Sequence, residues 1–520
     1  MDKNFSHSFV GIGRDKSGFH GTTIQTVVPC PTSNPEVSSL VTDSVPKKTI
    51  LSRDRTVSYD IIESIVKPQN FIGEPSTNRL NSFSNLSLSD FQPAAAEIYA
   101  WNEFYNSSNR YTFTKCLFQQ LNMVLPGIKV FFSLPTKSTT ISEISPVAIL
   151  DETADKKETV LKVFNKLYDK FQVGVKSDYV VIVGDGKSYD HMIKLKAEYG
   201  ESLQWVLPYP GDWHLMKNLL LVFIKIYFDA GLKQLATICH HGSTLRTLSE
   251  VTNWSVTHRF MVHAWEALMR HQINSFFLSL SDEKVHEVSS DFSDVVVNIL
   301  SSLDLNHDQD ANFCSPKFTD EVCKKKEEIF EVFSDSLLRE FADWRQTERE
   351  KSDTFAFWDQ FLHVDFMSYL AFYFAVRSRN WYLRNAALKK LSCLFHAFDR
   401  HNYLRMIPHH LADLLQFPKE VLQYFEQGCF SVSFSGEEFY SVALDEAHEM
   451  GINLRAKNAL NSFSQVSLAT LTYYLPYRAE ALHNFKKQIQ VEREDKNHRE
   501  TSVNYVITEE TTISDYFTIL

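Results

Sequence analysis

Residues 180–186 read Val-Val-Ile-Val-Gly-Asp-Gly, an apolar and largely β-branched run that ends in a polar turn. Such a run predicts a buried strand, and the turn places the carboxylate of Asp185 at the open end of that strand. A second run, residues 203–207, leads to Asp212 and His214 about one strand–helix–strand unit further on. Two carboxylates at neighbouring strand ends are typical of a divalent-metal site, because hard cations bind carboxylate oxygens. The alternative is that each aspartate is a turn residue that caps the following helix.

The composition indicates a globular protein with more than one folded unit. A chain of 520 residues is too long for one ordinary core, and its 44% hydrophobic residues provide ample material to bury. The net charge of −11 argues against a broad nucleic-acid-binding surface, which is usually basic, but it leaves room for a local basic groove. The seven cysteines are odd in number and lack zinc-ligand spacing, which predicts free thiols in a reducing compartment.

Neither a signal peptide nor a membrane span is predicted. The N-terminus lacks the apolar segment of a signal sequence. The longest apolar runs, near residues 219–228 and 369–376, are too short for a span and are flanked by charge. We therefore expect an intracellular protein with no membrane partner. A basic cluster within residues 47–55 is either a nuclear-localisation signal or the charge of a solvated linker.

The coarse pattern predicts an α/β core with a large helical insertion. Residues 18–29 are β-branched and predict a strand or hairpin, whereas residues 155–171 carry an apolar stripe at helical spacing. Pro and Gly are almost absent between residues 215 and 408, which favours long helices packed as a bundle. We divide the chain into first core strands, a polar disordered insertion, the rest of the α/β core, a helical insertion, a C-terminal core helix region and a flexible tail (1–30, 31–90, 91–214, 215–440, 441–487 and 488–520).

A polar face is predicted on the late helix of the core. Asp445, Glu449 and Asn453 lie four residues apart and therefore share one helical face. This spacing favours a role for Glu449 in a site, with Asp445 and Asn453 as supporting or DNA-binding residues. The alternative is a solvated face on which Glu449 pairs with Arg455 or Lys457.

Three separated motifs resemble those of one group of proteins. They are Pro-Gly-Asp-Trp-His-Leu-Met-Lys-Asn at 210–218, Phe-Asp-Arg-His-Asn-Tyr-Leu-Arg at 398–405, and the series Asp445, Glu449, Asn453 and Lys457. Together they are similar to a transposon-derived family of an uncharacterised domain, present in many copies in invertebrate and fungal genomes. The resemblance covers roughly residues 125–465. A strand-end aspartate, a helical insertion and a late glutamate also resemble the RNase H-like transposases of the acidic-triad class.

The resemblance implies an α/β fold in which the helical insertion interrupts an RNase H-like mixed-sheet core. It implies metal-dependent DNA cleavage or strand transfer, with Mg²⁺ or Mn²⁺ as cofactor, DNA as partner and a homo-oligomer as the working state. Asp185 and Glu449 would be the second and third metal-binding carboxylates, and Asp212 with His214 would lie beside them. Asp2 is the sole near-match for the first carboxylate, so either Asp2 or Asp212 would complete the catalytic set.

The incomplete first motif supports a second hypothesis, a catalytically inactive, domesticated or decayed copy that acts as an interaction scaffold. A two-metal site needs carboxylates that bridge ions about 3.5–4 Å apart, so loss of one ligand would weaken metal binding. The arginines of the 398–405 motif also have two interpretations. Arg400 and Arg405 either contact a phosphate backbone or, with Asp399, Asn402 and Tyr403, belong to a buried polar network that fixes a turn.

Overall fold

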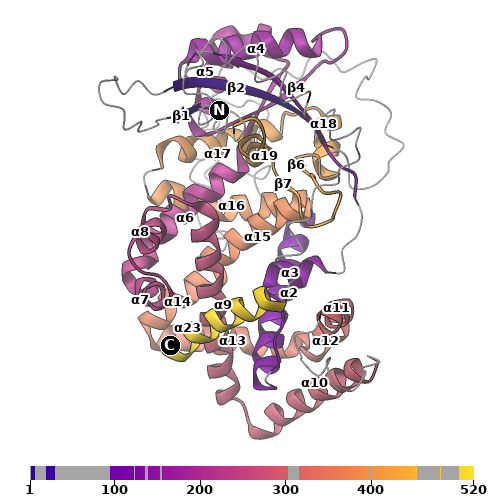
Figure 1. Ribbon diagram of the computed structural model, residues 1–520, viewed down its shortest axis with the longest axis vertical. Coiled ribbons are helices and arrows are strands. Elements are labelled where there is room, and N and C mark those ends of the chain that lie inside the picture. Colours follow the sequence, from indigo (N-terminus) through magenta and orange to yellow (C-terminus); the bar gives the residue numbers. More distant parts are fainter. Residues whose placement is uncertain are drawn as a thin grey trace, which may run out of the picture.

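The computed structural model of this protein is predominantly helical (Figure 1). It describes residues 2–5, 19–29, 94–121, 123–134, 139–150, 152, 155–302, 316–398, 400–453, 481 and 503–520. The predicted polar insertion at 31–90 lies outside these residues, as do the first part of the predicted tail and the motif residues Asp399 and Lys457.

The strands form small sheets. β1, β2 and β3 pair in that order as an antiparallel sheet, β4 and β5 form a parallel pair, and β6 and β7 form a short antiparallel pair. In Figure 1, β1, β2 and β4 lie at the top of the view beside α4 and α5. The strand bounds are β1 Asp2–Phe5, β2 Phe19–Val28, β3 Glu143–Leu150, β4 Val180–Gly184, β5 Val206–Pro210, β6 Ser431–Val432 and β7 Val442–Ala443.

The predicted fold class, an RNase H-like mixed-sheet core interrupted by a helical insertion, was wrong. Helices make up most of the described chain, and among the described strands no ladder joins the β1–β3 sheet to the β4–β5 pair. The apolar runs that we expected to build one wide sheet give strands of only 5 residues each in β4 and β5. Most members of the main hydrophobic cluster come from helices, whose apolar stripes pack against one another.

The helices divide between those beside the strands and a larger helical body. α4 and α5 adjoin β4 and β5, and α19 with η5 returns to that region late in the chain. The helix bounds are α2 Ala95–Gln120, α3 Ile128–Ser133, α4 Lys157–Phe171, α5 Gly186–Tyr199, η2 Gly200–Leu203, α6 Asp212–Tyr227, η3 Phe228–Leu232, α7 Lys233–Cys239, α8 Ser243–Glu250, α9 Trp254–Ser279, α10 Asp282–Ser302, α11 Pro316–Lys324, α12 Lys326–Val332, α13 Asp335–Lys351, α14 Asp353–Gln360, η4 Phe361–Asp365, α15 Phe366–Ser378, α16 Trp381–Ala397, α17 His401–Leu414, α18 Lys419–Glu426, α19 Leu444–His448, η5 Glu449–Asn453 and α23 Val503–Ile519.

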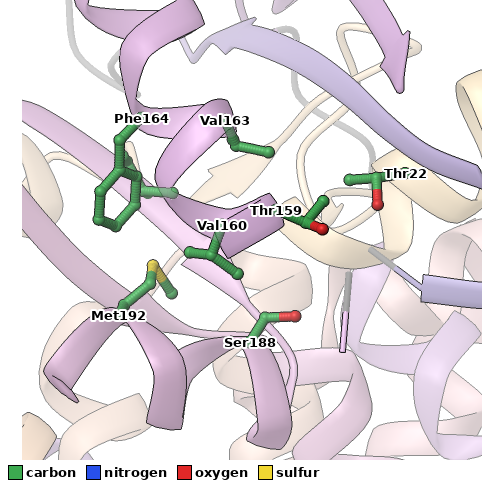
Figure 2. A pocket seen from close by; sticks show the side chains of 8 residues that line it. Thr22, Thr159, Val160, Val163, Phe164, Ser188 and Met192 are labelled. Carbon is green, nitrogen blue, oxygen red and sulfur yellow. The ribbon is translucent and has the colours of Figure 1, made fainter. Parts of the chain in front are cut away.

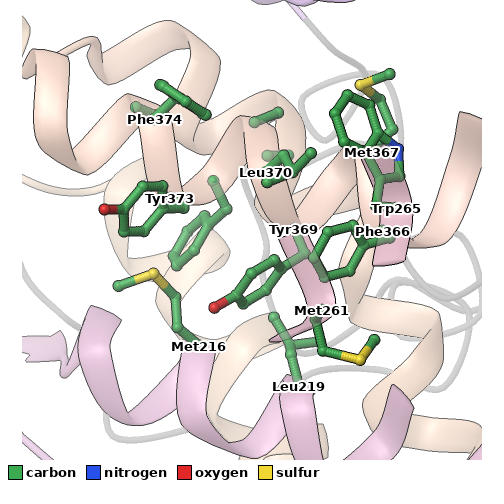
Figure 3. Packing of buried hydrophobic residues seen from close by; sticks show 14 of the residues in the cluster. Met216, Leu219, Met261, Trp265, Phe366, Met367, Tyr369, Leu370, Tyr373 and Phe374 are labelled. Atoms are coloured by element: carbon green, nitrogen blue, oxygen red, sulfur yellow. The ribbon is translucent and has the colours of Figure 1, made fainter. Parts of the chain in front are cut away.

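α15 is the central helix of the body. Each residue from Phe366 to Arg377 is buried, so the helix is covered on all sides, as its continuous apolar sequence requires. Figure 3 shows its aromatic side chains against Met216 and Leu219 of α6 and Met261 of α9. Each large apolar side chain buried in this way contributes roughly 1.5–3 kcal/mol relative to an exposed one.

The predicted boundaries between core, insertion and tail do not match the structure. α2, placed by sequence in the α/β core, packs mainly against α9 and α16. The last part of the predicted flexible tail forms α23, which packs on α7 and α9. α6 begins before the predicted boundary at residue 214 and continues into the body.

Two further sequence expectations concern the thiols and the membrane. Among the described residues, no disulfide bond joins the cysteines Cys116, Cys239, Cys323, Cys393 and Cys429. None of the helices in the described part of the chain is both long and apolar enough to span a membrane.

Candidate functional site

Asp185 lies at the carboxyl end of β4, directly before α5. Its Oδ1 accepts a hydrogen bond from the Ser188 amide at 2.9 Å, so it is the N-cap of α5. Burial acts to raise the pKa of the Asp185 carboxyl, whereas the His214 ring in its protonated form and the hydrogen bond from Ser188 act to lower it, and the resulting pKa lies below its ordinary value. The carboxylate is therefore ionised at neutral pH. The capping role and a role as metal ligand are compatible, because a carboxylate has two oxygens.

The carboxyl ends of β4 and β5 lie side by side. The strands are parallel, with Gly184 opposite Pro210, and the Gly211 amide donates to the Gly184 carbonyl at 2.8 Å. α5 and α6 therefore both begin at this edge, where open α/β units commonly bind ligands. This edge is the candidate site.

Asp212 is held in a buried ion pair. Its Oδ1 accepts from Arg384 Nη2 at 2.6 Å, and its Oδ2 accepts from the Tyr209 hydroxyl at 3.0 Å. The Arg384 side chain is 0% exposed, and it also bonds to His410 and Asn385. Burial raises the pKa of the Asp212 carboxyl above its ordinary value, although Arg384 acts in the opposite direction. The Asp212 carboxylate thus joins α6 to α16, and this arrangement favours a structural role over metal binding.

Asp445 caps the start of α6. From the sequence alone, Asp212 was the candidate for this role. Its Oδ1 accepts from the Trp213 amide at 3.1 Å, and its Oδ2 accepts from the His214 amide at 2.9 Å. The same Oδ2 lies 2.8 Å from Nδ1 of the His214 ring. From the sequence, Asp212 and His214 were expected to act as a pair. In the structure the partner of the His214 ring is Asp445, 231 residues away. No local sequence signal identifies this pairing.

Gly211 makes room for the Asp445 carboxylate. A Cβ atom at Gly211 would lie 2.5 Å from Asp445 Oδ2. We expect Gly211→Ala to reduce the free energy of unfolding by about 1–3 kcal/mol, since the carboxylate must move away from the α6 amides. Denaturant unfolding measures this loss. In an Asp445→Ala background the loss should be much smaller, and an equal loss in both backgrounds would contradict this explanation.

Glu449 and Asn453 lie on η5, the π-helical turn that follows α19. The Asn453 amide Nδ2 donates to Glu449 Oε1 at 3.0 Å, and Asn453 is 1% exposed. Gly451 in the same turn lies against β2, because a Cβ there would meet Gln25 Oε1 at 2.5 Å. α19 itself contacts β4 and α6. The fold therefore places Glu449 one helical turn beyond Asp445, on a segment that touches β2.

Tyr403 of α17 covers the first turn of α5. Its hydroxyl accepts a hydrogen bond from Asn218 Nδ2 at 2.8 Å. Its ring packs against Gly186, where a Cβ would lie 3.2 Å from Tyr403 Cζ. Burial, followed by the charges of Asp185 and Asp445, raises the pKa of Tyr403, so its hydroxyl keeps its proton at neutral pH. The sequence had placed Tyr403 in a turn-fixing network, and the structure adds its closeness to Asp185.

The two arginines of the 398–405 motif differ in their surroundings. Arg405 pairs with Asp190 of α5, with 3.0 Å between Nη2 and Oδ1. Arg400 is the residue before α17, and its side-chain Nε is buried without a hydrogen-bond partner. Arg405 therefore joins two helices, whereas Arg400 has no such task among the described residues.

The predicted set of metal ligands is brought together only in part. Among the residues that the structure describes, no group of three or more His, Cys, Asp and Glu side chains is placed to hold a metal ion. The Asp2 backbone pairs with Thr22 in the sheet, but its side chain lies outside the described part. Glu449 follows α19, which contacts β4, the strand that ends just before Asp185, whereas the Asp212 carboxylate is paired with Arg384.

A small cavity under β2 and β4 is not part of this site (Figure 2). It lies between these strands and the helices α4 and α5, and no charged side chain lines it. Its lining consists of Thr22, Thr159, Val160, Val163, Phe164, Ile182, Ser188 and Met192. The cavity is a packing defect of the core rather than a site for a polar ligand.

The molecule is thus a mainly helical protein with a polar site at the ends of two parallel strands. It belongs to a family of unknown function, DUF6589, whose model matches residues 113–498. The matched region contains Asp185, His214, Asp445 and Glu449. No curated protein matches the chain, and no solved structure matches it.

Proposed function

We propose that this protein binds Mg²⁺ or Mn²⁺ at the carboxyl ends of β4 and β5 and cleaves or transfers DNA phosphodiesters there. One observation carries most of the proposal. The hydrogen bonds that the Asp445 carboxylate accepts from the α6 amides and from the His214 ring bring a late segment, with Glu449, towards the strand ends where Asp185 lies. A transposon-derived origin, indicated by the three sequence motifs, supplies DNA as the substrate class.

Asp185 and Glu449 are the carboxylates that would hold the metal ion. Mg²⁺ commonly keeps several waters and takes one or two protein carboxylates together with substrate phosphates, so three protein ligands are not required. When bound, such an ion activates water or a 3′-hydroxyl and stabilises the leaving oxygen. Asp212 takes no part in the proposed site, because Arg384 and Tyr209 use its carboxylate.

His214 is the proposed proton acceptor. Asp445 Oδ2 accepts hydrogen bonds, so the short contact to the ring assigns the proton to Nδ1 and leaves Nε2 as the acceptor. The carboxylate also fixes the orientation of the ring. The side chain of His214 is 19% exposed, which gives a solvent-borne ligand access to the ring. Asp445 is therefore a positioning residue in this scheme.

Calorimetry with Mn²⁺ tests the metal site. We expect saturable binding by the wild-type protein and at least about tenfold weaker binding by Asp185→Asn and by Glu449→Gln. Asparagine is as good an N-cap as aspartate, so Asp185→Asn preserves the start of α5. The matched control is Asp229→Asn, whose side chain is 86% exposed. The proposal fails if the folded wild-type protein shows no saturable binding or if Asp185→Asn binds as the wild type does.

A catalytically inactive interaction scaffold is the second candidate. It is favoured by the engagement of Asp212 with Arg384 and by the net charge of −11. In this case Asp185 and Asp445 serve only as helix caps. Mn²⁺ binding without cleavage of a labelled DNA duplex would favour the scaffold, as would the absence of Mn²⁺ binding. Light scattering of the purified protein tests the homo-oligomer that the resemblance to transposases implies.

A further inference from the structure

Arg400 has unused hydrogen-bonding capacity close to the candidate site. Its Nε atom is buried without a partner, and its side chain makes no ion pair with any residue in the described part of the chain. A guanidinium has five N–H donors, and a buried donor left without a partner costs about 1–3 kcal/mol. A buried donor of this kind calls for a partner, and unlike Arg270 and Arg377, which also have an unpaired Nε, Arg400 has no carboxylate partner among the described residues.

The fold places Arg400 beside Tyr403 and the start of α5. The Tyr403 amide donates to the Arg400 carbonyl at 2.8 Å, so the two residues belong to the same first turn of α17. Asn402 and Tyr403 both pack on Gly186, where a Cβ would meet them at 3.0 and 3.2 Å. Gly186 directly follows Asp185. The positive charge of Arg400 also acts on the Tyr403 hydroxyl, where it lowers the pKa against the larger effect of burial.

The Tyr403 hydroxyl is a second donor in the same place. Its oxygen accepts a hydrogen bond from Asn218 Nδ2 at 2.8 Å, which leaves its own proton to be donated elsewhere. The ring is fixed by stacking on Phe395, with ring centroids 5.4 Å apart. A rigid neutral donor next to a guanidinium suits an anionic oxygen.

We infer that Arg400 and the Tyr403 hydroxyl form a phosphate contact beside Asp185, which binds a phosphate oxygen of the ligand. Guanidinium groups match phosphate oxygens in both charge and geometry. The inference rests on the proposed function and names the residues through which the helical body would hold the substrate. Arg405 is excluded from this contact, because Asp190 already binds it. The phosphate belongs to a polynucleotide backbone or to a free phosphate group, and the experiment separates these two sources.

Fluorescence anisotropy with a labelled single-stranded oligonucleotide tests the contact. We compare Arg400→Ala, at the N-cap of α17, with Arg405→Ala, a change of the same residue type within α17. Arg400→Ala should weaken binding about tenfold and reduce the salt dependence, as the slope of log K against log salt, by about one. Arg405→Ala should change the affinity less than about twofold. Tyr403→Phe, which keeps the ring, should weaken binding by about threefold to tenfold without changing the salt slope.

The outcomes separate this inference from the proposed function. Equal losses in Arg400→Ala and Arg405→Ala would indicate a general charge effect and overturn the contact. Wild-type protein that binds neither the oligonucleotide nor inorganic phosphate would also overturn it. Binding of inorganic phosphate alone, lost in Arg400→Ala, supports a contact for a free phosphate group. Mn²⁺ calorimetry on the same variants decides the metal site independently, because neither arginine is a proposed ligand, and we expect unchanged Mn²⁺ affinity in both.

Discussion

Asp212→Asn should lower the free energy of unfolding by about 3–5 kcal/mol, because it leaves Arg384 buried without a counter-charge. The Arg384 side chain is 0% exposed and that of Asp212 is 1% exposed, so water cannot replace the lost carboxylate. Asparagine has nearly the same shape as aspartate, which limits the change to charge and hydrogen bonding. Denaturant unfolding of the wild-type and variant proteins measures the difference.

A double variant and a metal titration distinguish the structural role of Asp212 from a catalytic one. Arg384→Met in the Asp212→Asn background removes the remaining buried charge and should restore much of the lost stability. The Mn²⁺ affinity of Asp212→Asn should equal that of the wild type. A folded Asp212→Asn protein that binds Mn²⁺ at least about tenfold more weakly would contradict the structural role and restore Asp212 as a candidate ligand.

Local signals predicted the elements around the site well. The β-branched run and the Gly-Asp-Gly turn indicate β4 and the start of α5, and Asp185 indeed caps that helix. Residues 155–171 predict a helix that the structure gives as α4, and α16 is one of the helices expected between residues 215 and 408. These elements are short-range features, whose pattern of apolar and capping residues is complete within the segment.

The partners of Asp212 and His214 could not be predicted, because each of these side chains pairs with a residue far away in the chain. Asp212 and Arg384 are 172 residues apart, and His214 and Asp445 are 231 residues apart. Neither pair leaves a local signal, since a lone arginine on a helix and an aspartate before one are common. The number of strands in the sheet that contains β4 could not be predicted for the same reason. A five-residue apolar run such as β4 fits either a wide sheet or a two-stranded pair, and only long-range ladders decide between them.

The helix α23 shows how tertiary contacts override local preference. Its threonine-rich sequence is a poor helix former, which explains why a flexible tail was expected. Val506, Ile513 and Tyr516 are nevertheless buried on one side of the helix, against α7 and α9. The helix is stabilised by this packing and by the charges at its centre rather than by its own propensity.

Glu510 lies at the centre of the contact between α23 and the helical body. Its carboxylate binds Lys115 at 2.8 Å and Arg270 at 2.5 Å. Both cations are buried, with 2% and 0% of their side chains exposed, and Glu266 pairs with Arg270 beside them. Removal of the Glu510 charge therefore leaves two buried cations with one carboxylate. We expect Glu510→Gln to lower the free energy of unfolding by about 3 kcal/mol and to release α23, which limited proteolysis detects as early cleavage near the C-terminus.

The neighbouring glutamate provides a matched control. Glu509 reaches His263 at 3.4 Å, a longer contact to a group that is charged only when protonated. Glu509→Gln should therefore reduce stability by less than about 1 kcal/mol. Losses of equal size in the two variants would show that α23 responds to any change of charge and that the buried pairs of Glu510 have no special role.

The effect of Glu510 should also depend on pH. Burial acts to raise the pKa of this carboxyl, but Lys115 and Arg270 outweigh burial and lower it well below its ordinary value. Because the pKa is lower in the folded than in the unfolded protein, the stabilisation is fully present above the unfolded pKa of about 4.3. It declines as the pH falls below that value and the unfolded state takes up the proton. The stability difference between wild type and Glu510→Gln should thus be constant from pH 7 to about 5 and shrink towards pH 3. A difference that stays the same at pH 3 would mean that packing, and not charge, holds α23 in place.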